Sequence, residues 1–163
     1  MRDRYKTNQV RLENVGMLKV LIAEDELMIA DMLEEFLTER GFAVCGIART
    51  VEEAVELGEL HKPDLAVFDV QLAKGGSGQE VARRLKSRGP LGVLYATGGS
   101  RKSALGPSDG EAVITKPYRM EDVARALEIV HGILIQGSTS GPVPRGFRLL
   151  AEPSTAPVGA SSA

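Results

Sequence analysis

The stretch Leu18–Glu26 reads LKVLIAEDE, a nearly continuous apolar run that ends in three acidic residues. A short apolar run of this kind is typical of a strand buried on both faces of a sheet. A helical pattern follows, because the apolar residues between Ile29 and Leu37 fall on one face at a spacing of 3.6 residues. Gly41 then predicts the end of this helix.

The same alternation of strand and helix repeats along the chain. Four further apolar runs predict strands at Phe42–Ala48, Leu65–Val70, Leu91–Ala96 and Ala112–Thr115. Helical patterns are found at 51–62, Gln79–Arg88 and Met120–Ile135, the first opened by a capping box of Thr50 and Glu53. Alternating strands and helices imply right-handed crossovers, so we expect an α/β fold with a doubly wound, five-stranded parallel sheet.

The connection between the fourth and fifth strands departs from this rhythm. Glycine and proline residues in Gly98–Glu111 leave only Ser100–Leu105 free to be helical. A helix that short is marginal in water because of the cost of nucleation. We therefore predict a shortened fourth helix or a mobile loop.

The two ends of the chain differ in composition from the centre. Residues 1–17 are polar and lack a period, which predicts a flexible N-terminal arm before a domain at 18–136. Residues 137–163 are rich in Gly, Pro, Ser, Thr and Ala, which predicts a disordered C-terminal tail. Within that tail, Phe147–Leu150 is either a docking segment or without a structural role.

The composition excludes several classes of function. The 163 residues carry 20 Lys and Arg against 22 Asp and Glu, a balance that argues against nucleic acid as the main partner. The single cysteine, Cys45, excludes an internal disulfide. No apolar run reaches the roughly 20 residues that cross a bilayer. We therefore expect a cytoplasmic protein without a membrane partner.

Polar side chains stand where the predicted strands end. They are Glu24 and Asp25 after the first strand, Asp69 in the third, Thr97 after the fourth and Lys116 after the fifth. The carboxyl ends of parallel strands meet at one edge, where open α/β sheets bind ligands. A like-charge pair at 4 Å costs about 4 kcal/mol at an effective dielectric constant of ~20, and a hard cation such as Mg²⁺ removes that cost.

This grouping predicts phosphoryl chemistry. Asp69 would be a carboxylate nucleophile, since aspartyl phosphate formation is a known form of covalent catalysis. Thr97 would donate a hydrogen bond to the phosphoryl group, and Lys116 would supply a positive charge.

Four motifs in order resemble those of a response-regulator receiver domain over Lys19–Gln136. They are EDE at Glu24–Glu26, FDV at Phe68–Val70, ATG at Ala96–Gly98 and TKPY at Thr115–Tyr118. The resemblance implies a flavodoxin-like strand order of 2-1-3-4-5 and phosphorylation by a sensor histidine kinase. It implies a Mg²⁺ site at Glu24, Asp25, Asp69 and the backbone carbonyl of Gln71, with Asp69 as phosphoacceptor, Thr97 as switch hydroxyl and Lys116 as the family's lysine.

One feature of this sequence departs from the receiver family's pattern, and another resembles a particular subgroup of the family. Val113 stands where the family has an aromatic switch residue, so aromatic rotation is not the expected readout at this position. LYATGGS at Leu94–Ser100 resembles a subgroup of stand-alone receivers whose fourth strand reads Phe-Ala-Thr-Gly, although Tyr95 replaces the phenylalanine. The subgroup implies a mobile fourth helix and, often, a kinase of the HWE type.

The resulting hypothesis is a single-domain response regulator that is not an enzyme beyond assisting its own phosphorylation and dephosphorylation. No DNA-binding domain is expected, so the signal would pass to a downstream protein. The alternatives are a phosphate sink, a receiver-like scaffold that works without phosphorylation and, less favoured because of its acidic first loop, a flavin- or nucleotide-binding module. Both a monomer and a homodimer stay open, the latter through the apolar side chains of Ile129, Ile133 and Ile135 on the last helix.

Overall fold

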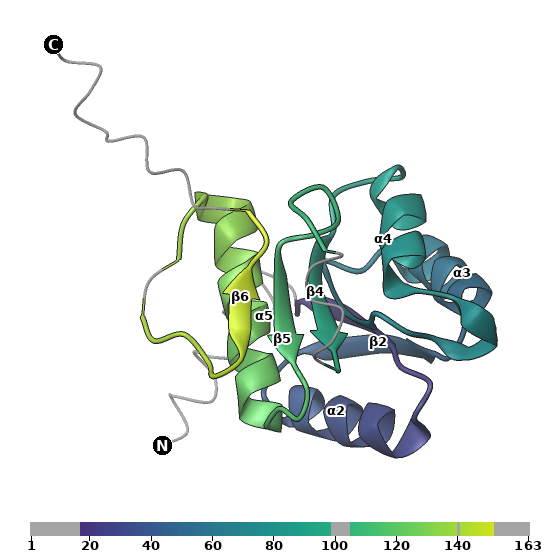
Figure 1. Ribbon diagram of the computed structural model, residues 1–163, viewed down its shortest axis with the longest axis horizontal. Coiled ribbons are helices and arrows are strands. Elements are labelled where there is room, and N and C mark those ends of the chain that lie inside the picture. The colour runs from purple at the N-terminus through teal and green to yellow at the C-terminus, as the bar shows by residue number, and fades with distance from the viewer. Residues whose placement is uncertain (1–16, 99–104, 140, 152–163) are drawn as a thin grey trace, which may run out of the picture.

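The computed structural model describes residues 17–98, 105–139 and 141–151 of the chain. Within these residues the centre of the molecule is a six-stranded sheet with the order β2-β1-β3-β4-β5-β6 (Figure 1). The parallel strands are β1 (Lys19–Ala23), β2 (Ala43–Ala48), β3 (Leu65–Asp69), β4 (Gly92–Thr97) and β5 (Ala112–Thr115). The predicted strand order 2-1-3-4-5 is confirmed, and one antiparallel strand, β6 (Phe147–Leu149), is added beside β5.

Helices cover both faces of this sheet (Figure 1). They are α2 (Leu27–Glu39), α3 (Val51–His61), α4 (Gly78–Lys86) and α5 (Met120–Gln136), with a short 3-10 turn η1 (Ala73–Gly75) before α4. One apolar cluster joins the sheet to α3 and α4, and a second joins it to α2 and α5. None of these helices, among the described residues, has the length and apolar character needed to span a membrane.

Alternation along the strands divides the core between these two faces. In β1, Leu21 belongs to the cluster under α3 and α4, whereas Val20 and Ile22 belong to the cluster under α2 and α5. All three side chains are fully buried. The continuous apolar runs of the sequence are therefore explained by burial on both faces.

The helix boundaries follow the predicted local signals. The Thr50 hydroxyl accepts a hydrogen bond from the backbone N–H of Glu53 at 3.2 Å, and the Glu53 carboxylate accepts one from the N–H of Arg49 at 3.1 Å. These bonds satisfy donors at the start of α3 that have no partner within the helix. Gly41 has a φ of 95° after α2, a conformation that favours glycine.

The part of the β4–β5 connection that the structure describes contains no helix. Residues 105–111 form turn and coil, while residues 99–104 lie outside the described residues. The buried Tyr95 hydroxyl donates to the carbonyl of Asp109 at 2.7 Å. This bond ties the loop before β5 to the centre of β4.

The predicted disorder of residues 137–163 is wrong for the segment that contains β6. Phe147 and Leu149 pack on the cluster under α2 and α5, and Leu150 joins the other cluster with only 8% of its surface exposed. Of the two alternatives predicted for Phe147–Leu150, the structure supports a docking segment, because the segment gains both apolar burial and backbone pairing on the edge of β5. The predicted N-terminal arm and the end of the tail fall mainly on residues 1–16 and 152–163, outside the described residues.

Candidate functional site

The candidate site lies at the carboxyl ends of the parallel strands. Glu24 and Asp25 follow β1, Asp69 is the last residue of β3, and Thr97 is the last residue of β4. Lys116 follows β5 directly. Parallel pairing of neighbouring strands brings these chain positions to one edge of the sheet.

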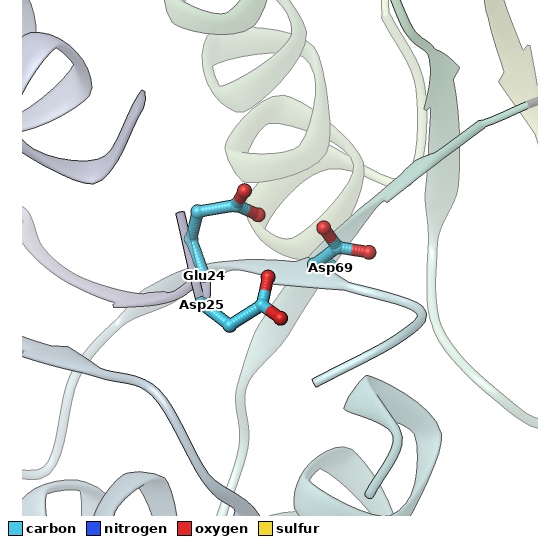
Figure 2. A group of neighbouring side chains, drawn as sticks. All are labelled: Glu24, Asp25 and Asp69. Atoms are coloured by element: carbon cyan, nitrogen blue, oxygen red, sulfur yellow. The ribbon is translucent and has the colours of Figure 1, made fainter. Parts of the chain in front are cut away.

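Three carboxylates meet at this edge. One oxygen each of Glu24, Asp25 and Asp69 lies within 4.8 Å of the others. Figure 2 shows the three side chains around a shared space, two from the end of β1 and one from the end of β3. Glu24 is only 3% exposed, so part of this acidic group is removed from water. Such a group is costly without a compensating positive charge.

Lys116 supplies one such charge. Its Nζ lies 2.6 Å from Asp69 Oδ2 and 3.4 Å from each carboxylate oxygen of Glu24. Its backbone N–H donates to the carbonyl of Thr97 at 2.7 Å, which fixes the start of the β5–α5 connection against β4. The lysine therefore contacts Glu24 and Asp69 from the end of β5, which lies three places from β1 and two places from β3 in the sheet.

The protonation of the site follows from burial and from these neighbours. Burial, the hydrogen bond to Asp69 and the negative charge of Asp69 together raise the pKa of Glu24 from 4.5 to about 8, and the nearby Lys116 acts in the opposite direction. Burial opposes the charge on Lys116, but the hydrogen bond to Asp69 and the negative charges of Asp69 and Glu24 together outweigh it, and the pKa of Lys116 is raised. Near neutral pH, Glu24 thus holds a proton that a metal ion would displace, while Lys116 stays positively charged.

Two further predicted residues stand beside this group. The backbone N–H of Gln71 donates to Asp69 Oδ1 at 2.9 Å, so the two oxygens of Asp69 have different partners. Thr97 is 3% exposed and follows Ala96, which pairs with Asp69 across the sheet. The Gln71 carbonyl as a metal ligand and the Thr97 hydroxyl as a switch stay predictions.

Gly78 is a residue of the site that the sequence did not single out for its role. A Cβ at this position would lie 2.4 Å from the backbone oxygen of Asp69 and 2.8 Å from Phe68 Cβ. The glycine lets α4 begin directly against the end of β3. The sequence signal for this role is the glycine-rich stretch Lys74–Gly78, whose composition does not show which glycine approaches the strand.

A valine, Val113, occupies the β5 position where the family has its aromatic switch residue, and the nearby aromatic side chain is that of Tyr95 in β4. Val113 is buried and stands opposite Tyr95 in the pairing of β4 with β5. The Tyr95 ring lies against Gly110, where an added Cβ would be 2.9 Å from the ring. The aromatic side chain in this part of the core therefore comes from β4, and its hydroxyl is bound to the loop before β5.

The residues present fit a hard divalent cation. Carboxylate oxygens are the ligands that Mg²⁺ prefers, and Mg²⁺ uses few of them because it keeps bound water or phosphate oxygens. Glu24, Asp25 and Asp69 offer such oxygens from two neighbouring strands. The fold and the site together define an α/β protein with a cluster of three carboxylates and one lysine at the carboxyl edge of its sheet.

Comparison with known proteins assigns the family. Residues 20–128 match the family model of the response regulator receiver domain, and the chain belongs to this family. It is 35% identical over 114 residues to the transcriptional regulatory protein PdtaR of Mycobacterium tuberculosis, covering 68% of this chain and 55% of PdtaR. It is 33% identical over 111 residues to the phyllosphere-induced regulator PhyR of Methylorubrum extorquens, covering 67% of this chain and 42% of PhyR. The chain thus spans about half the length of the curated relatives that it matches.

Solved structures agree with this assignment. The solution structure of the PhyR receiver domain from Erythrobacter litoralis matches with a TM-score of 0.65 and 26% identity, covering 79% of this chain and 99% of that domain. The crystal structure of PhyR from Brucella abortus matches with a TM-score of 0.62 and 28% identity, covering 74% of this chain and 49% of that protein. The receiver identity and the flavodoxin-like fold predicted from the sequence are therefore confirmed.

Proposed function

We propose that this protein accepts a phosphoryl group on Asp69 from a phosphohistidine of a sensor kinase, in a Mg²⁺-dependent reaction, and relays the signal through protein–protein interaction. The observation that carries this proposal is the 2.6 Å contact of Lys116 Nζ with Asp69 beside the other two carboxylates. A lysine and an acidic group around one aspartate are suited to a reaction that brings a phosphoryl dianion to a carboxylate.

The transfer forms one bond and breaks one. A carboxylate oxygen of Asp69 forms the new O–P bond, while the N–P bond of the phosphohistidine breaks and its electron pair stays on the imidazole nitrogen. The Lys116 ammonium group forms an ion pair with the oxygens of the phosphoryl group during the transfer, and the Thr97 hydroxyl donates a hydrogen bond to one of these oxygens. Bound Mg²⁺, held by Glu24, Asp25, Asp69 and the Gln71 carbonyl, supplies positive charge that offsets the phosphoryl oxygens.

An apolar patch on α2 is the proposed docking surface for the kinase. Leu27, Met28 and Met32 are 51%, 79% and 53% exposed, and they begin directly after the acidic residues of the site. Exposed apolar side chains that lie together mark interaction surfaces, and methionine adapts to the shape of a partner. The likeness of Leu94–Ser100 to the Phe-Ala-Thr-Gly subgroup suggests a kinase of the HWE type.

The downstream partner is proposed to be a protein. One relative of known structure, PhyR from Bartonella quintana, is described as an anti-anti-sigma factor and is 28% identical to this chain. That name concerns the whole relative, of which this chain covers 57%. Affinity capture with the phosphorylated and unphosphorylated protein separates a signalling protein, whose partners change, from a phosphate sink or an unphosphorylated scaffold, whose partners do not.

The proposed reaction is tested by incubation with acetyl phosphate. We expect the intact mass to rise by one phosphoryl group with Mg²⁺ and to stay unchanged when a chelator removes the ion. Asp69→Asn should abolish the gain, whereas Asp31→Asn, at an exposed acid on α2, should leave it intact. A gain that survives Asp69→Asn, or no gain at all, would contradict the proposal.

A further inference from the structure

The edge of β5 is covered by the protein's own C-terminal segment. In the antiparallel pairing of β5 with β6, Ile114 stands opposite Phe147 and Ala112 opposite Leu149. Figure 1 shows β6 beside β5 at the end of the sheet, although the whole of α5 separates the two strands in sequence. Without β6, β5 would end the sheet with a row of unpaired backbone groups.

Backbone bonds and apolar side chains hold β6 in place. The N–H of Thr115 donates to the carbonyl of Gly146 at 3.1 Å, and the N–H of Leu150 donates to the carbonyl of Glu111 at 3.0 Å. Phe147 and Leu149 pack on the cluster under α5 while Arg148 between them is exposed. The segment therefore has the alternation of apolar and polar residues that is typical of a strand with one buried face.

This attachment is short. β6 has three residues, and residues 137–146 connect it to α5. In the described part of that connection, Arg125 Nε donates a hydrogen bond to the carbonyl of Pro142 at 3.2 Å. A strand this short gains little from its backbone bonds alone, so its attachment depends on the burial of Phe147, Leu149 and Leu150, and a segment held by so few residues opens at lower cost than the central strands.

β6 is also linked to the candidate site through two successive residues. Thr115 donates its N–H outward to β6, and Lys116 donates its N–H inward to Thr97. The side chain of the same Lys116 contacts Asp69. A phosphoryl group on Asp69 would draw the Lys116 side chain toward it, and the neighbouring Thr115, whose nitrogen lies 3.1 Å from the Gly146 carbonyl oxygen, is the β6-bound residue next to that movement.

We propose that the β5 edge is a strand-binding surface that β6 occupies in the resting protein and leaves when Asp69 is phosphorylated. The link to phosphorylation rests on the proposed function. The occupant that replaces β6 is an extended segment of a partner protein, antiparallel to β5, with apolar side chains at alternate positions as in Phe147 and Leu149. Backbone pairing supplies affinity in such complexes, and the alternate side chains supply specificity.

Amide hydrogen exchange at two adjacent residues tests the release. Beryllofluoride with Mg²⁺ stands in for the phosphoryl group on the full chain, and its bound ¹⁹F signal reports that the site is loaded. We expect the Thr115 amide to exchange at least about tenfold faster after loading, while the Lys116 amide, bound to Thr97, keeps its rate. Unchanged exchange at Thr115 in a loaded protein would overturn the inference and leave the proposed function standing. A missing ¹⁹F signal would instead overturn the proposed function, and with it the link to phosphorylation.

A substitution within β6 tests the surface without loading. Arg148→Pro removes the backbone N–H in the middle of β6, whereas Arg148→Ala keeps it. We expect fast Thr115 exchange in Arg148→Pro only, and renewed protection when a synthetic peptide with the sequence of residues 145–151 is added. A control peptide with serine in place of Phe147 and Leu149 should not protect. Equal exchange in both variants, or equal protection by both peptides, would show that the edge is no strand-binding surface.

Discussion

Lys116 is the residue on which the charge balance of the site depends. Its ammonium group lies between two carboxylates that would otherwise face each other without a cation. Asp25, by comparison, is only half-buried. The lysine is therefore the side chain whose removal should separate binding of the metal from transfer of the phosphoryl group.

Lys116→Ala should slow phosphorylation by acetyl phosphate by about a hundredfold, the usual scale for loss of one charge-stabilising group in a transition state. The reason is that no other side-chain cation contacts Asp69 among the described residues. The rate of mass gain at saturating Mg²⁺ measures the effect. Lys116→Arg, which keeps the charge, should recover part of the rate; a rate equal to that of the wild type in Lys116→Ala would contradict this role.

Glu24 should make stability depend on pH. Its pKa is about 8 in the folded protein against an ordinary 4.5, so the folded state keeps a proton that the unfolded state releases. The free energy of unfolding should therefore fall as pH rises from about 4.5 to about 8 and level off above, with a slope from this group of at most about 1.4 kcal/mol per pH unit. Urea unfolding with a chelator present measures it.

Glu24→Gln should lack this part of the pH dependence, because the amide does not titrate. The difference in unfolding free energy between variant and wild type should thus grow across the same pH window. A difference that is constant from pH 5 to pH 8 would mean that Glu24 is already ionised in the folded protein.

At the scale of the elements, α2 presents the proposed kinase surface. Met28→Glu should lower the rate of phosphotransfer from the cognate kinase about tenfold, because it puts a charge where apolar area would be buried. The rate with acetyl phosphate should not change. Leu60→Glu on α3 is the matched control, since Leu60 is 72% exposed and lies on another helix. Equal losses in the two variants would argue against docking on α2.

The start of α4 is set by Gly78. Gly78→Ala should destabilise the fold by about 1–3 kcal/mol, because the new Cβ would overlap the backbone of Asp69. Phosphorylation should slow as well, since Asp69 must shift. Gly89→Ala, where no atom lies within 4 Å of the added Cβ, should change neither quantity. Urea unfolding and the rate of mass gain measure the two effects. A Gly78→Ala protein with the wild-type unfolding free energy and phosphorylation rate would show that the backbone near Asp69 moves to accept the new Cβ at no cost.

The elements that the sequence predicted well are those with strong local signals. β1 and β3 are continuous apolar runs, and α3 opens with the capping box of Thr50 and Glu53. β6 gave only the weak signal of the short apolar group Phe147–Leu150, because a three-residue strand depends on the edge of β5, which the sequence does not display. The fit of Gly78 against Asp69 is likewise a matter of tertiary packing.

At the scale of the whole molecule, the two edges of the sheet are unlike. β2 ends one side with half-buried residues, whereas β5 is covered by β6 on the other. The isoleucines of α5 on which the possibility of a homodimer was based also differ in exposure, since Ile129 is 1% exposed and Ile135 is 63% exposed. Ile129 therefore belongs to the interior, and any contact between copies through α5 would depend on its last turn.

The meeting of the strand ends at one edge of the sheet was predictable because parallel strands place their carboxyl ends together. Glu24, Asp25, Asp69 and Lys116 were found in this way, and the structure joins them by contacts or short distances. The direction of each contact was not predictable, since it depends on side-chain rotamers. The division of the Asp69 oxygens between Gln71 and Lys116 is an example.

The central claim is that Asp69 is the residue that carries the phosphoryl group. Borohydride reduces an aspartyl phosphate to homoserine, which peptide mass spectrometry locates in the sequence. After incubation with acetyl phosphate and Mg²⁺, the account predicts homoserine at position 69, and none when a chelator is present. Homoserine at another aspartate, or an unmodified Asp69 in protein that has gained the mass of a phosphoryl group, would contradict it.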